Sequence, residues 1–68
     1  MENRRFDIVR LDRGIWHLAD SGRLGEDFIS AEDASLRALE LARLVDGNAT
    51  VYVWHRDEPK KIYEKRIG

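Results

Sequence analysis

The chain has 68 residues, no cysteine and a formal net charge of −1 from 12 basic and 13 acidic side chains. This length predicts a single domain, residues 1–68, that buries only about 60% of the surface its unfolded form exposes. The lack of cysteine excludes disulfides, thiolate metal ligands and cysteine nucleophiles. No apolar run approaches the roughly 18 residues of a membrane span, and the N-terminus lacks a signal peptide's apolar stretch. We therefore expect a cytoplasmic protein that does not enter a membrane.

The first part of the chain shows β-type patterns. Residues 6–11 are rich in β-branched and aromatic side chains and predict a strand. Residues 12–14 predict a turn, with Gly14 free to adopt a positive φ, and residues 15–19 complete the hairpin. The two glycines of residues 21–25 predict a loop, and residues 26–29 predict a short third strand.

A helix follows, from Ser30 to Gly47. Ser30 is a typical N-cap and Asp33 an approximate capping-box partner. Gly47 provides a residue that can end a helix in the left-handed conformation. Six apolar side chains lie on one face at helical spacing: Ala31, Ala34, Ala38, Leu41, Ala42 and Val45.

The last third predicts a second pair of strands. Residues 50–55 give the strongest strand pattern in the chain. Residues 57–59 predict a turn, and residues 61–67 predict an edge strand. The fold class is therefore α+β: an antiparallel sheet of four to five strands with one α-helix packed on one face.

Alternation along the strands predicts which side chains face the helix. Val51 and Val53 suit the alanine face of the helix, so Tyr52 and Trp54 point away from it. In the second strand we expect Trp16 and Leu18 to point inward. In the last strand we expect Ile62 to be inside and Tyr63 outside.

The sheet face away from the helix is accordingly the predicted partner-binding surface. Aromatic side chains edged by cations anchor protein interfaces, and they also stack the bases of single-stranded nucleic acids. They can equally serve only to stabilise the sheet through cross-strand pairs. The residues concerned are Tyr52, Trp54, Arg56, Lys61, Tyr63 and Lys65.

Charge is unevenly distributed along the chain. Residues 26–46 hold six acidic and two basic side chains, whereas residues 60–66 hold four basic and one acidic. This asymmetry can steer a partner, or it can simply keep the protein in solution. The small negative net charge favours another protein as the partner over nucleic acid.

One leucine pair offers a second surface. Leu36 falls among polar residues of the predicted helix, and Leu39 flanks its apolar stripe. The two could form the seam of a homodimer, which would help so small a domain reach adequate stability. A lone exposed leucine is also ordinary.

No catalytic or cofactor motif is present. A metal site would need His17, His55 and a carboxylate such as Asp20 or Asp57, without the usual close spacing of ligands. His55-Arg-Asp57 matches three letters of the kinase catalytic loop, but the chain is far too short for a kinase. We therefore expect no metal, no cofactor and no enzymatic activity.

The order of elements resembles a small bacterial family catalogued as domain of unknown function 2188. The shared features are Gly14-Ile-Trp16, an alanine-rich helix, Val51-Tyr-Val53, His55-Arg-Asp57 and a strand from Lys61, over about residues 6–66. Glu58-Pro59 replaces the turn glycine of that family. The resemblance implies the fold and leaves function open.

The sequence thus favours a small non-catalytic module that binds a protein through the open sheet face or the acidic helix face. The alternative is a module that binds single-stranded nucleic acid on the same sheet face. A further alternative is a phage-type inhibitor acting by binding, because such inhibitors are often equally small, acidic α+β proteins.

Overall fold

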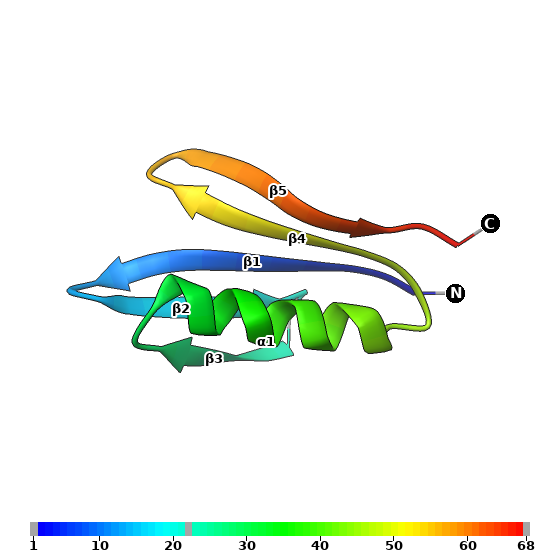
Figure 1. The fold of residues 1–68 in the computed structure, drawn as a ribbon, viewed down its shortest axis with the longest axis horizontal. Helices are drawn as coiled ribbons and strands as arrows, with labels where there is room; N and C mark the ends of the chain where they lie inside the picture. The colour runs from blue at the N-terminus through cyan, green and yellow to red at the C-terminus, as the bar shows by residue number, and fades with distance from the viewer. Residues whose placement is uncertain (1, 22, 68) are drawn as a thin grey trace.

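The computed structural model describes residues 2–21 and 23–67, which form a sheet and one helix (Figure 1). The sheet has five strands in the order β3-β2-β1-β4-β5, and the helix packs on one of its faces. The predicted α+β class is confirmed. Within the described residues, no helix is long and apolar enough to cross a membrane. The elements are β1 (Glu2–Asp12), β2 (Ile15–Asp20), β3 (Arg23–Phe28), α1 (Ala31–Leu44), β4 (Gly47–His55) and β5 (Glu58–Lys65).

The sheet is mixed, whereas the sequence predicted an antiparallel one. β1 and β4 lie side by side and run parallel, from Glu2 paired with Gly47 to Ile8 paired with Val53. The other three pairings are antiparallel. The cause is the crossover through α1, which brings the chain from β3 back to the end of the sheet where β1 begins.

The core lies between α1 and the facing side of the sheet. Small alanine side chains let the helix approach the strands closely, and branched side chains of β1 and β4 fill the space. The predicted inward placement of Val51 and Val53 is confirmed, as is that of Leu18. Trp16 packs against this core and is half-buried. The buried apolar residues are Phe6, Ile8, Leu18, Ala34, Ala38, Ala42, Val45, Ala49, Val51 and Val53.

The beginning of α1 matches the prediction, but its end does not. Ser30 is the N-cap, and its side chain accepts a hydrogen bond from the backbone N–H of Asp33. The helix ends at Leu44, and its C-cap Val45 has an extended backbone conformation. Lys65 caps this end instead, since its ammonium group donates to the backbone oxygens of Arg43 and Val45.

Gly47 has another role than the predicted one. It is the first residue of β4, has a φ of 143°, and lies directly against the backbone of Glu2. A side chain at this position would overlap the Glu2 backbone. Glycine therefore permits β4 to begin in contact with β1.

Several strand boundaries also differ from the prediction. β1 begins at Glu2, and β3 begins at Arg23, inside the predicted loop of residues 21–25. The second hairpin turns at residues 56–57, one residue earlier than expected, with Pro59 already in β5. Because β5 is an edge strand, it can accommodate a residue without a backbone donor.

A β-bulge reverses the predicted orientation of β5. Val51 pairs with Tyr63 but the next residue, Tyr52, pairs with Lys61, so Ile62 is an extra residue. Tyr63 consequently packs against the core, and Ile62 is 41% exposed. The prediction that Ile62 points inward and Tyr63 outward is wrong.

The glycine contact at the start of β4 can be tested by paired substitutions. Gly47→Ala should lower the free energy of unfolding by about 3 kcal/mol or more, because the new Cβ meets the Glu2 backbone at a strained φ. Gly14→Ala is the matched control: its φ is 76° but nothing lies within 4 Å, so we expect a loss of about 1 kcal/mol. Urea denaturation followed by circular dichroism measures both. Equal losses would contradict the close β1–β4 contact.

Candidate functional site

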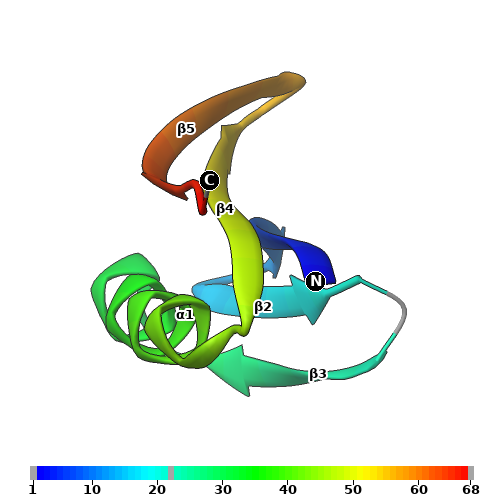
Figure 2. The same cartoon turned by 90° about the vertical axis from the view of Figure 1, so that its right-hand side faces the viewer.

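The helix leaves one face of the sheet bare, and Figure 2 shows α1 on a single side of the twisted strands. Strand alternation and register place fourteen side chains on this bare side, which we call the uncovered face. They are Asn3, Arg5, Asp7 and Val9 of β1, His17 and Ala19 of β2, Asp27 of β3, Asn48, Thr50, Tyr52 and Trp54 of β4, and Pro59, Lys61 and Glu64 of β5.

A network of four side chains forms the centre of the uncovered face. The guanidinium carbon of Arg5 lies 4.0 Å from the ring centroid of Tyr52. Arg5 Nε is 3.0 Å from Asp7 Oδ2, and Trp54 Nε1 donates to Asp7 Oδ1 at 2.8 Å. The hydrogen bond that Arg5 donates to Asp7 raises the pKa of the Arg5 guanidinium above its usual value. Both rings are half-buried, so they are held in place while part of each remains accessible.

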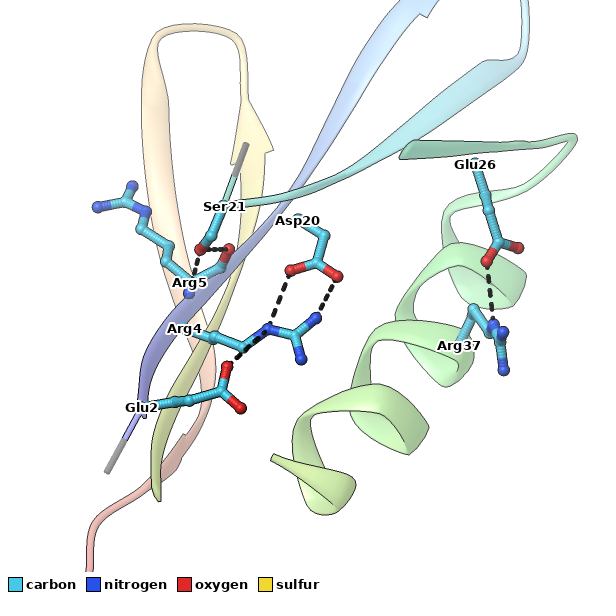
Figure 3. Close-up of polar contacts among 7 residues, drawn as sticks. All are labelled: Glu2, Arg4, Arg5, Asp20, Ser21, Glu26 and Arg37. Carbon is cyan, nitrogen blue, oxygen red and sulfur yellow. Dashed lines mark hydrogen bonds and ion pairs between the residues drawn. The ribbon is translucent and has the colours of Figure 1, made fainter. Parts of the chain in front are cut away.

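The backbone of Arg5 is fixed by Ser21 (Figure 3). The Ser21 hydroxyl accepts from the Arg5 backbone N–H at 2.8 Å and donates to the Arg5 carbonyl at 2.9 Å. The backbone N–H of Ser21 also donates to that carbonyl at 3.2 Å. These contacts orient the Arg5 side chain toward the uncovered face.

The neighbouring Arg4 points to the opposite side of the sheet, toward the helix (Figure 3). Its Nε donates to Asp20 Oδ1 at 3.2 Å, and a second nitrogen bonds the other carboxylate oxygen. Asp20 is 8% exposed, and among the residues that the structure describes it is the one buried charged side chain, which this bidentate pair satisfies. Arg4 and Arg5 together anchor β1 on both faces.

A further ion pair joins β3 to α1. Arg37 Nε lies 3.3 Å from Glu26 Oε1, as Figure 3 also shows. The hydrogen bond with Glu26 raises the pKa of Arg37 above its usual value. The pair is on the surface, so it orients β3 without adding much stability.

Three of the predicted partner-binding residues do share the uncovered face: Tyr52, Trp54 and Lys61. Lys61 Nζ is 3.4 Å from Glu64 Oε1. The pKa of Glu64 is below its usual value, mainly because of the hydrogen bond from Arg66 and additionally because of Lys61. Lys61 is thus engaged by a carboxylate.

The remaining three predicted residues lie elsewhere. The β5 bulge places Tyr63 and Lys65 on the helix side, where Tyr63 packs against the core and Lys65 caps α1. Their predicted place beside Tyr52 and Trp54 is wrong. Arg56 lies in the β4–β5 turn and is exposed.

The two leucines of the predicted dimer seam also lie in different surroundings. Leu36 is 60% exposed on α1, whereas Leu39 packs against the core. Leu39 therefore already contributes to the domain interior, and Leu36 is the member of the pair that faces solvent.

A hollow of about 570 Å³ lies at the end of the sheet where both hairpins turn. We call it the notch. β1 and β4 remain paired only as far as Ile8 and Val53, and beyond this point the hairpins separate. The lining residues are Val9, Arg10, Trp16, Trp54, His55, Arg56 and Glu58.

The two histidines lie at different places. His17 Nδ1 is 2.7 Å from Asp27 Oδ1 on the uncovered face, and His55 lines the notch. Among residues 2–21 and 23–67, no group of three or more potential metal ligands forms.

Sequence reasoning missed four residues that shape these surfaces: Arg5 and Asp7 at the centre of the uncovered face, and Arg10 and Trp16 in the notch. Alternation within β1 does place Arg5 and Asp7 opposite Phe6 and Ile8. Their contact with Tyr52 and Trp54, however, depends on β1 and β4 being neighbours, and no sequence motif indicates that pairing.

Comparison of the chain with protein-family models, with curated proteins and with solved structures gives no match. The resemblance to domain of unknown function 2188 therefore stays a prediction, and the functional proposal rests on the geometry.

The role of Asp7 can be checked through the Trp54 indole. In Asp7→Ala we expect the Trp54 Nε1–H resonance to move upfield and exchange faster with solvent, because its 2.8 Å hydrogen bond is lost. Two-dimensional ¹H–¹⁵N spectra, assigned with Trp54→Phe, measure this. Asp27→Ala is the control, since Asp27 contacts His17 on the same face. If the control shifts Trp54 as much as Asp7→Ala does, the network is not as described.

Proposed function

We propose that this chain is a non-catalytic binding module that acts in the cytoplasm and docks a protein partner on the uncovered face. The observation that carries the proposal is the pair of half-buried rings, Tyr52 and Trp54, on the bare side of the sheet. Partly accessible aromatic side chains of restricted mobility are typical anchors of protein interfaces, because little conformational entropy is lost on binding.

Charge on the uncovered face supports a protein over a nucleic acid. Arg5 is paired with Asp7, and Lys61 with Glu64. These cations are already neutralised by carboxylates, so they are poorly suited to following a phosphate backbone. A partner with an apolar centre and a polar rim of both signs complements such a surface.

The proposal is tested by site-specific photocrosslinking in nuclease-treated lysate of the native host. A benzophenone amino acid at Thr50, next to the rings on the uncovered face, should crosslink one defined protein. The same probe at Leu36, exposed on α1, is the matched control and should not capture that protein. Capture from Leu36 alone would move the docking surface to the helix and contradict the proposal.

The captured protein is then purified and titrated against variants of the chain. Tyr52→Ala and Trp54→Ala should each weaken binding by about tenfold or more, as expected for interface anchors. Leu36→Ala should leave the affinity unchanged. Circular dichroism establishes that each variant is folded. Undiminished binding by the folded double variant Tyr52→Ala/Trp54→Ala would overturn the proposal.

A further inference from the structure

The notch combines features of a small-molecule site at a place distinct from the centre of the uncovered face. It forms because β1 and β4 stop pairing after Ile8 and Val53, while the β1–β2 and β4–β5 hairpins both continue. Figure 1 shows both hairpin tips at the end of the molecule away from the two termini. The resulting hollow, about 570 Å³, is within the usual range for small ligands.

Both tryptophans of the chain line the notch, and they come from opposite faces of the sheet. Trp54 belongs to the uncovered face, whereas Trp16 pairs across β1–β2 with Arg10 on the helix side. Both indoles are half-buried. A hollow with an aromatic side chain on either side provides flat apolar surface for a planar ring.

The notch also holds two arginines with free guanidinium groups. Within residues 2–21 and 23–67, neither Arg10 nor Arg56 forms an ion pair or a side-chain hydrogen bond, in contrast with Arg4, Arg5 and Arg37. Glu58 is the single acidic residue of the lining, so the arginines leave it net positive. Their donors are available to an anion.

The backbone conformation of Arg56 is an independent indication of a ligand site in the notch. Its φ is 61°, in the left-handed region where glycine or asparagine is favoured at a hairpin turn. A long cationic side chain therefore occupies a position where the local conformation favours other residues. Strained positions of this kind often occur at ligand sites.

We propose that the notch binds a nucleoside phosphate, either free or as part of a single strand. The base stacks on Trp16 or Trp54, and the phosphate accepts hydrogen bonds from Arg10 and Arg56. An acidic peptide would use the arginines but not the indoles, so it fits the lining less completely. Trp54 is shared with the protein-docking surface, but Arg10 and Arg56 are not, so variants of the two arginines test the notch separately.

Intrinsic fluorescence provides a direct readout, because the only two tryptophans of the chain line the notch. Adenosine 5′-monophosphate and decathymidylate are each titrated into the full chain, and the affinities are confirmed by calorimetry. We expect quenching by at least one of them with a Kd below about 1 mM. Binding of the mononucleotide indicates a free ligand, and binding of decathymidylate alone indicates a strand.

Two charge variants separate the notch from general electrostatic attraction. The double variant Arg10→Gln/Arg56→Gln should weaken nucleotide binding by about tenfold or more. The control Arg23→Gln/Arg43→Gln removes the same amount of charge outside the notch and should change the affinity by less than about twofold. Should the double variant fail to fold, Arg56→Asn, which suits the left-handed backbone, replaces it.

Three results would overturn the proposal. The first is no quenching and no heat with either nucleotide probe. The second is equal weakening by the notch variant and its control. The third is inorganic phosphate or adenosine binding as tightly as adenosine monophosphate, since the site would then not recognise base and phosphate together.

Discussion

The parallel pairing of β1 with β4 is the constraint on which the rest of the structure depends. It places two strands that are far apart in the sequence at the centre of the sheet, with Glu2 against Gly47 and Ile8 against Val53. The alanine face of α1 makes this possible, because a helix lined by small side chains can lie close to both strands. Gly47 permits the first contact, and the bidentate Arg4–Asp20 pair joins β1 to β2 beside it.

The same pairing creates both candidate binding regions. Where β1 and β4 are in register, Arg5 and Asp7 of one strand reach Tyr52 and Trp54 of the other, and two aromatic rings become fixed on the bare face. Where the pairing stops, the hairpins separate and the notch opens. Trp54 belongs to both regions, so occupation of one can influence the other through the orientation of a single indole.

Local patterns in the sequence were sufficient to predict the helix, the strands and much of the core. The N-cap Ser30, the alanine stripe of α1 and the inward valines of β4 follow from spacing and alternation alone. Three features depend on interactions distant in sequence and could not be predicted: the parallel direction of β4, the bulge at Ile62, and the capping of α1 by Lys65. The bulge matters most for the candidate site, because one extra residue moves Tyr63 from the predicted binding face to the core.

Nuclear Overhauser contacts across the centre of the sheet are the most direct test of the β1–β4 pairing. We expect a parallel series of backbone contacts between β1 and β4 that starts near Asn3 and Asn48 and ends at Ile8 and Val53. Beyond these residues, the two hairpin tips should show contacts only within each hairpin. An antiparallel series would contradict the central pairing. A parallel series that continues as far as Arg10 and His55 would contradict the notch.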